Sequence, residues 1–474
     1  MASTSFAGSR DAAPANLRLT PETYTTVGTL LDQNKDFVVP QLVETYGDQG
    51  ITGFLKLTGA VSGGGTSDEV RYHEVGRRHR TISVNSSGVS GVSGDQMVIN
   101  VDADTNGVAA GPNDILMDTA DGRRYIVIGV GNADPTNAAA DLTVASLDGE
   151  TATDNYSGAS ADAFIVLGNL YGQGTEQPGH FTDTDVEKRE NPFMIVKDRY
   201  QVNGSQATNI GWVDIGGGEY RWFMYGEQEA RRRFEDRREM MMLFAETGND
   251  NNFGDASSYS FTDAQAPGVG SEGYISAVEN RGIVVSNANA NPLDSFAEFD
   301  DIILELDKNG ATSEYAMYLN RKQDLAIDDM LASGVSTGVT AGLAGQFGAF
   351  NNDADMAVKL GFKSFTRGGY TFHKHDWKLL NDPTLLGASN YLQGAMVPMS
   401  QVADARTGVK APALALYYKE ANGYSREMEH WVTGGGVLGH NNNGDGGRDV
   451  ATFHYRSEIA LVTRAANQHV IIKG

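Results

Sequence analysis

Cysteine is absent from the 474 residues of this chain. This absence excludes disulfides, thiolate nucleophiles and cysteine-based zinc or iron-sulfur sites. Long hydrophobic runs are also missing: no stretch approaches the roughly 18 consecutive apolar residues of a membrane helix, and the first ten residues lack the apolar core of a signal peptide. We therefore expect a soluble protein that is made in a cytoplasm, without contact with a membrane.

Positive charge is scarce. The 37 Lys and Arg residues against 61 Asp and Glu residues give a formal net charge of -24. A protein whose main task is to neutralise phosphates has a basic surface, so nucleic acid is not the expected primary ligand. The hydrophobic fraction of 40% is enough for a buried core, and the 57 glycines predict many turns.

The first half of the chain divides by composition into three parts. Residues 1–50 are polar to weakly amphipathic and resemble an arm that packs on something else. A Gly/Ser-rich stretch follows, in which Val70 and Tyr72 alternate as one strand of a hairpin and Thr81, Ile82 and Val84 as the other. Residues 95–172 hold five short apolar runs separated by turn residues, which predict a small inserted β module, a compact barrel.

Residues 219–247 predict a long amphipathic helix of about 40 Å. Phe223, Phe234, Met241 and Phe244 fall on one apolar stripe at helical spacing. Acids and bases alternate on the opposite side, including Arg231, Arg232 and Arg233. Opposite charges four residues apart predict the pairs Glu227–Arg231, Arg231–Glu235 and Arg232–Asp236, each contributing about 0.2–0.5 kcal/mol. The default role of such a surface is to face solvent or another subunit.

The remainder alternates between the two kinds of element, so the fold class is α+β. The pattern predicts strands over Ile275–Val285, helices over Phe296–Leu306 and Ser313–Ala332, and strands over Phe362–His375, Leu414–Tyr418 and Val450–Ile472.

The candidate metal ligands are two weak groups. His373 and His375 lie on one face of a predicted strand, but a third ligand at a recognisable spacing is missing, so an interface or solvated histidine pair is favoured. Asp102, Asp104 and Asn106 match the first half of a calcium loop whose twelfth position is Asn113 instead of Glu, which favours a polar turn.

Catalytic motifs are not evident. Gly216–Gly218 before the long helix lacks the lysine and hydroxyl residue of a phosphate-binding loop, so a hinge is the better interpretation. We expect neither an enzyme nor a bound cofactor. The dense basic cluster Arg77, Arg78 and Arg80 is a candidate contact for a partner's acidic patch, with plain exposure as an equal alternative.

Three segments carry a resemblance to a known family. They are Arg189–Ala207, which contains the run Ile195-Val-Lys-Asp-Arg-Tyr-Gln-Val-Asn-Gly-Ser205; Gly226–Met242; and Tyr455–Gln468. These resemble the major capsid proteins of tailed bacteriophages, those of crAss-like and related phages of Bacteroidota in particular. The similarity covers about a quarter of the chain.

The resemblance implies a herpesvirus-type shell fold that self-assembles into hexamers and pentamers of an icosahedral head in the virion. It implies other virion proteins as partners (portal, decoration, scaffold), and genomic DNA enclosed without sequence-specific binding. The implied parts are an N-terminal arm (1–56), an extended loop (57–185) with the β module, a peripheral domain (186–290) with a spine helix (219–247), an axial domain (291–424) and returning C-terminal strands (425–474).

Two alternatives remain open. The first is another structural protein of a phage, such as a decoration or tail component. The second is a secreted calcium- or carbohydrate-binding β-rich protein, which would fit the β module and the glycine content. It would need an export signal and a carboxylate cleft, and the sequence shows neither.

Overall fold

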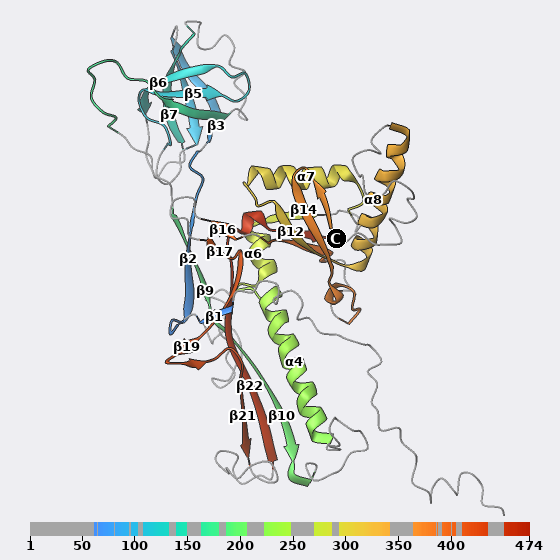
Figure 1. Cartoon of the computed structure of the whole chain (residues 1–474). Helices are drawn as coiled ribbons and strands as arrows, with labels where there is room; N and C mark the ends of the chain where they lie inside the picture. Colours follow the sequence, from blue (N-terminus) through green and yellow to red (C-terminus); the bar gives the residue numbers. More distant parts are fainter. Residues whose placement is uncertain are drawn as a thin grey trace, which may run out of the picture.

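The computed structural model describes residues 61–63, 65–79, 81–93, 96–102, 108–131, 139–148, 163–179, 186–205, 222–247, 270–286, 293–341, 364–384, 386, 391–399, 401–403, 410–434 and 450–474. They form an elongated body of two sheets, with a small barrel held away from it at the end of two long strands (Figure 1). Helices and sheets are thus mixed, as an α+β fold requires. The expected arm, 1–56, and the glycines Gly216–Gly218 lie outside the described residues.

The first sheet carries the long helix. Its strands run in the order β1 (Val61–Gly63), β18 (Leu414–Tyr418), β22 (Val450–Thr463) and β10 (Met194–Asn203), and β21 (Glu429–Gly434) also pairs with β22. Strands β10 and β22 are antiparallel over ten positions, from Met194 opposite Ile459 to Asn203 opposite Val450. Helix α4 (Trp222–Phe244) lies along one face of this sheet (Figure 1).

Helix α4 is held by a small aromatic cluster in its first half. Phe234 is fully buried with Ala230, against Val202 of β10 and Tyr455 of β22. Ala230 and Phe234 are four residues apart and so lie on one face of the helix, which means that packing on the sheet explains this part of the predicted stripe. The side chain of Phe223 lies outside the described residues.

The predicted stripe is wrong at Met241, which is 43% exposed. Met242 and Leu243 are buried instead, and Phe244 is partly buried against the same cluster. The reason is an added partner: the last turn of α4 packs against helix α6 (Tyr274–Arg281) as well as against the first sheet. The buried side of the helix therefore rotates, which a single periodic stripe cannot express.

The second sheet is six-stranded and mixed. Its order is β11 (Ile283–Ser286), β23 (Val470–Lys473), β15 (Gly394–Pro398), β12 (Glu314–Leu319), β14 (Tyr370–Asp376) and β13 (Ser364–Arg367). Helices α7 (Phe296–Lys308) and α8 (Arg321–Ala341) flank it (Figure 1). Helix α7 begins with a capping box formed by Ser295 and Glu298. Phe299 and Leu306 of α7 pack on Phe372 of β14 and Met317 of β12.

Two sequence expectations about this half are wrong. Ser313–Ala332 is not one helix but strand β12 followed by α8. The side-chain oxygen of Asn320 accepts a hydrogen bond from the backbone N–H of Gln323 at 2.7 Å and so caps the start of α8. The strand is buried on both faces, so its unbroken apolar run carries no period of two. Ile275–Val285 contains helix α6 before β11, and residues Tyr274–Val278 are all buried, which hides the helical period.

The two sheets share one core. Tyr274 and Ile275 of α6 are buried with Leu414 and Ile459 of the first sheet and Ile471 of the second. The expected segment boundaries consequently do not match the sheets: β18 belongs to the first sheet although it lies in 291–424, and β11 to the second although it lies in 186–290. The C-terminal segment supplies a strand to each sheet, which ties the two together.

A two-stranded ribbon leaves the body. It is formed by β2 (Glu69–Val75) and β9 (Val186–Pro192), antiparallel over their whole length. The predicted hairpin partner of β2 is therefore wrong, because Thr81–Val84 belongs to β3 (Thr81–Ser93), which pairs with β4 and β8. Alternation determines the face that a residue occupies but not the strand beside it.

The ribbon carries a closed barrel between its two strands. Its order is β3, β4 (Gln96–Asp102), β7 (Ala139–Ser146), β6 (Arg124–Gly131), β5 (Asp114–Asp118) and β8 (Ala163–Asn169). It begins with β3, ahead of the expected boundary at residue 95. Its interior is a separate cluster in which Tyr125 meets Phe164 edge-on, with ring centroids 6.0 Å apart.

Candidate assembly surfaces

The base of the ribbon is fixed to the body by one buried asparagine. The Asn191 amide nitrogen donates to the carbonyl oxygens of Leu461 (2.6 Å) and Glu272 (3.0 Å). Its amide oxygen accepts from the Ser271 hydroxyl (3.0 Å) and the Glu272 backbone N–H (2.8 Å). All four hydrogen-bonding positions of the side chain are therefore used. Asn191 joins β9, β22 and the chain before α6 at a single point.

The other strand of the ribbon is fixed beside it. The hydroxyl of buried Tyr72 donates to the Thr463 carbonyl oxygen at 3.3 Å, and burial raises the pKa of that phenol. A carboxylate oxygen of Glu74 accepts from the backbone N–H of Ala465 at 3.0 Å, and Arg189 lies 3.5 Å from the same carboxylate. Both strands of the ribbon thus hold the C-terminal end of β22.

The far end of the ribbon is apolar and uncovered. Val75 and Val186 lie opposite each other in the strand register and are 58% and 52% exposed. Burying these two large apolar side chains in a contact with another molecule would remove them from water and so stabilise that contact. This end of the ribbon is accordingly a candidate contact with another molecule.

In the basic cluster at this end of the ribbon, Arg77 makes a contact within the chain. The Arg77 guanidinium donates to the Lys308 carbonyl oxygen (2.6 Å) and to the Asn309 side-chain oxygen (3.2 Å), at the C-terminal end of α7. Cations are favoured at helix C-termini, so Arg77 forms an internal contact between the neck of the barrel and the second sheet's helix. Arg78 is exposed, and Arg80 lies outside the described residues.

The outer side of α4 carries exposed charges. Arg231 pairs with Glu235 at 3.3 Å and Arg233 pairs with Glu229 at 3.7 Å. Arg232 is also exposed, and it too interacts with another group of the chain. Glu227 accepts instead from the hydroxyl of Tyr455, at 2.7 Å. Pairs this exposed contribute little to stability, which leaves the arginines available to a partner.

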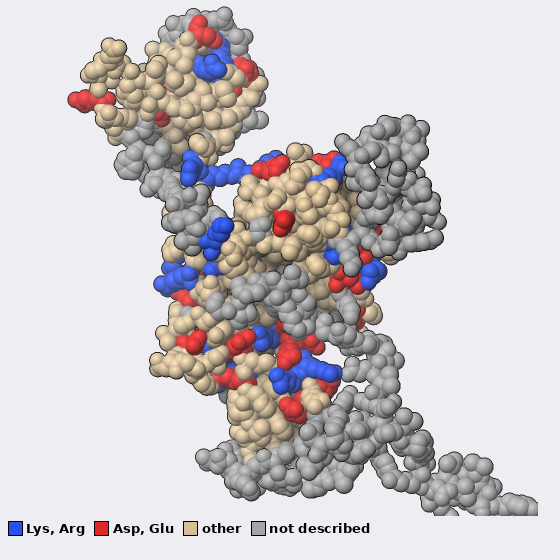
Figure 2. Space-filling view, viewed as in Figure 1, with Lys and Arg blue, Asp and Glu red and all other residues tan. Residues whose placement is uncertain are grey.

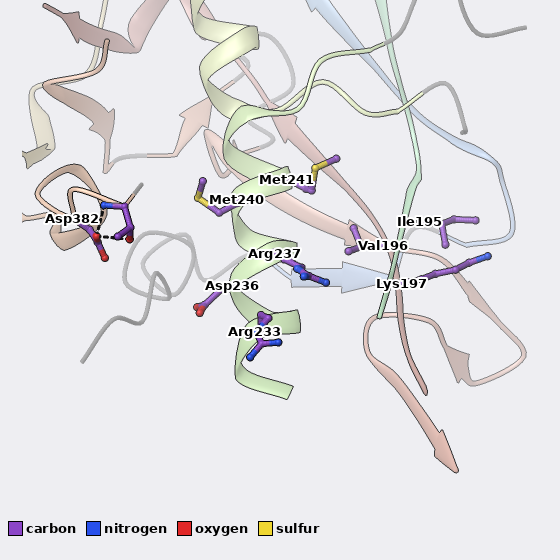
Figure 3. Close-up of a pocket in the computed structure, with 10 residues that line it drawn as sticks. Ile195, Val196, Lys197, Arg233, Asp236, Arg237, Met240, Met241 and Asp382 are labelled. Atoms are coloured by element: carbon purple, nitrogen blue, oxygen red, sulfur yellow. Dashed lines mark hydrogen bonds between the residues drawn. The ribbon is translucent and has the colours of Figure 1, made fainter. Parts of the chain in front are cut away.

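A groove of about 630 Å³ lies between α4 and β10. Figure 3 shows Met240, Met241, Arg233 and Arg237 on the helix and Asp382 on a separate loop, while Ile195 and Lys197 border the groove on the strand with side chains that point away from the helix. Ile195 is 50% exposed. Arg237 is paired with Asp198 at 2.7 Å, and the hydroxyl and backbone N–H of Thr384 lower the pKa of Asp382. The groove therefore combines an open apolar floor with a charged rim.

The opposite face of the first sheet is aromatic and charged, with Arg456 paired to Glu429. Trp431 of β21 stacks on His454 of β22 with ring centroids 5.1 Å apart, and the Arg456 guanidinium lies 5.0 Å from the Trp431 centroid. Lys197 and Arg199 are exposed in the adjacent positions of β10. The sequence alone does not reveal this group, because only the strand register brings its members together.

Of the metal candidates, the structure describes the side chains of His373 and His375. Within the described ranges no group of three or more His, Asp or Glu side chains is placed to hold a metal ion. His375 stacks on Tyr318 at 5.4 Å, and burial, together with His373, lowers its pKa. Asp104 and Asn106 lie outside the described residues, and Asp102 ends β4 with its side chain likewise outside them.

Lys374, which lies between the two histidines on β14, points towards α8. Lys374 is almost fully buried and lies 2.8 Å from Asp324 and 2.6 Å from Asp328. This cluster attaches α8 to the second sheet, so its role is structural.

None of the helices that the structure describes is long and apolar enough to cross a lipid bilayer.

Comparison with known proteins gives distant structural likenesses. No family model matches the sequence, and no curated protein matches it. The capsid of Cyanophage P-SCSP1u aligns at 10% identity and a TM-score of 0.41, over 97% of this chain and 98% of that one. The structure from Mycobacterium phage Ogopogo aligns at 7% identity and a TM-score of 0.43, over 94% of this chain and 98% of that one. The SrpI encapsulin of Synechococcus elongatus aligns at 10% and 0.32, over 61% and 77%.

Proposed function

We propose that this chain is the major capsid protein of a tailed bacteriophage, which self-assembles into the hexamers and pentamers of an icosahedral head. One observation carries the proposal: a ribbon, fixed at its base by Asn191 and Tyr72, projects from the body and exposes Val75 and Val186 at its far end. A projecting ribbon with an apolar end gains stability by lying on a neighbour. The sequence resemblance of Arg189–Ala207 and Tyr455–Gln468 supports the same function.

The charge balance is consistent with this function. Six copies bring together 6 × -24 = -144 formal charges, so attraction must come from apolar burial and local ion pairs. The exposed apolar residues lie on separate surfaces, among them Val75 and Val186 on the ribbon, Met241 in the groove, and Ile195 on the other face of β10. Several such surfaces on one subunit permit contact with several neighbours at once.

The elements take the roles that the resemblance implies. Helix α4 is the spine helix on the peripheral sheet, the ribbon β2–β9 is the extended loop, and the sheet flanked by α7 and α8 is the axial part. Residues 1–56 are the arm. An acidic shell repels the phosphates of the enclosed DNA, which favours packaging without sequence-specific binding. Portal, decoration and scaffold proteins are the remaining partners, and the mechanism needs neither a reaction nor a cofactor.

The test is expression of the full chain, alone and with its genomic neighbours, followed by electron microscopy of the purified material. Closed shells, or rings of six and five subunits, support the proposal. Rods or wide rings would indicate a tail component instead. A calcium-dependent monomer would indicate the binding protein, and a monomer that turns over a substrate would refute a purely structural function.

A further inference from the structure

The barrel has an apolar outer face on one side only. The outward positions of three adjacent strands are Ile115 and Met117 on β5, Ile126 and Ile128 on β6, and Ile165 and Leu167 on β8. Ile128 and Leu167 are 46% and 51% exposed, and the other four are half-buried. Ile115 lies opposite Ile126, and Met117 opposite Ile165, so the six side chains are neighbours across the strands.

The inner core does not account for these residues. The inward positions of the same strands, such as Leu116, Tyr125 and Phe164, are fully buried in the barrel. The outward positions of a closed barrel are normally polar where water covers them. Strands β4 and β7 follow that rule at Gln96, Asn100, Asp141 and Thr143, although Val98 and Ala145 also point outwards. The large apolar residues are therefore concentrated on the β8–β5–β6 side.

The body leaves this face open. The barrel stands clear of the two sheets at the end of the ribbon (Figure 1), and its surface in Figure 2 is mostly uncharged, with scattered acidic and basic residues. Among the described residues of these three strands, Arg124 is the charged residue next to the six, opposite Met117 at the edge. No acidic side chain occupies an outward position among them, although the chain as a whole carries a net charge of -24.

We propose that this apolar face binds the same face of the barrel of a second copy. Two copies of an acidic chain repel each other over most of their surface, and this face lets two barrels meet without opposing carboxylates. A two-fold contact uses one patch on both molecules, so an uncharged apolar patch is complementary to itself. The proposal rests on the proposed function, which brings barrels of neighbouring subunits within reach.

The area indicates when the contact forms. Three strands about 4.8 Å apart and five residues at about 3.4 Å each cover roughly 240 Å². A stable pair of proteins buries about 800 Å² on each partner. The face is too small to hold two free subunits together, but it suffices where an assembly already raises the effective concentration of one barrel beside another. We therefore expect barrel pairing in assembled particles and not in dilute subunits.

The cysteine-free sequence permits a direct test. Single variants Ile126→Cys, Ile128→Cys and Leu167→Cys are assembled as full-length protein and treated with a short bismaleimide, with Gln96→Cys as the matched control on the polar side. Covalent dimers should form from at least one patch variant at ten-fold or greater yield over the control, and should disappear when the particles are dissociated first.

The outcomes separate this inference from the proposed function. If wild-type particles form but no patch variant gives dimers above the control level, the barrel contact is refuted and the capsid function stands. Cross-links only to a different protein also refute it, since they show that another partner covers the face. A wild-type chain that stays monomeric at every concentration refutes both.

Discussion

The ring of Phe234 on α4 stacks on the ring of Tyr455 on β22, with centroids 5.6 Å apart and planes inclined by 29°. The hydroxyl of the same tyrosine donates to Glu227, two turns earlier on the helix. Burial and this hydrogen bond raise the pKa of Tyr455, which stays protonated at every physiological pH. One side chain thus holds the helix on the sheet by an apolar and a polar contact together.

Removing the ring of Phe234 should be costly. Phe234→Ala is expected to lower the free energy of unfolding by about 3–5 kcal/mol, because it leaves a cavity under the helix. Met241→Ala on the same helix should change it by less than about 1 kcal/mol, since that side chain is 43% exposed. Urea denaturation followed by circular dichroism measures both. Equal losses in the two variants would contradict the packing described for α4.

Asn191 should be a second point of sensitivity. Asn191→Ala leaves the buried groups of Ser271, Glu272 and Leu461 without their partner, and we expect a loss of about 3 kcal/mol in unfolding free energy. Asn203→Ala, at the exposed end of β10, is the matched control and should lose less than about 0.5 kcal/mol. Thermal melts of the purified variants decide between them, and an unchanged Asn191→Ala melt would argue against the junction.

Arg77 should act through α7. Arg77→Ala removes the two hydrogen bonds to the end of that helix, so amide exchange in Leu306–Gly310 should become faster. Arg78→Ala, next to it in sequence and exposed, should leave exchange in that segment unchanged. Hydrogen-deuterium exchange with mass spectrometry makes the comparison. The same rates in both variants would mean that Arg77 does not hold the neck of the barrel against α7.

His469 should make the fold sensitive to acid. It is fully buried, and burial lowers its pKa from 6.5 to about 3. The unfolded chain binds a proton there below about pH 6.5 while the folded chain does not, so folding stability falls as the pH drops from about 6.5 towards 3. The slope from this one group is up to about 1.4 kcal/mol per pH unit.

A variant separates that group from other titrating residues. His469→Gln should lower stability at pH 7 by breaking the contact with Tyr274 (3.2 Å), but its stability should fall less steeply between pH 6.5 and 4. The control is His79→Gln, a substitution at an exposed histidine outside the two sheets. Urea titrations at a series of pH values give the slopes. Identical slopes in all three proteins would refute the assignment.

The sequence predicted elements best where one side was buried and the other open. The buried residues of helix α7, such as Phe299 and Leu306, recur at helical spacing, and those of strands β4 and β6, such as Val127, alternate with less buried ones. The sequence predicted all three elements. Where burial is complete, as at Tyr315–Leu319 and Tyr274–Val278, the period is lost and the elements were misassigned. Strand partners over long separations were missed as well, since β2 pairs with β9 and not with the nearer β3.

The candidate surfaces were partly foreseen. The alternating charges of α4 and the basic cluster were visible in the sequence, but the role of Arg77 depends on the end of α7, more than 200 residues away. The junction at Asn191 lay within the resembling segment, and an asparagine before a proline inside a strand is a signal that was available. The outer face of the barrel needed the strand register, because Ile115, Ile126 and Ile165 become neighbours only after closure.

The register of the ribbon also makes residues 76–185 a replaceable cassette. Val75 and Val186 stand side by side, so the chain enters and leaves the inserted part at almost one point. A foreign domain with adjacent termini, or a designed tight turn, fits the same opening without stretching either strand. The tip of the ribbon is thus a natural site at which to graft new protein onto the subunit, with the remaining sheets left as they are.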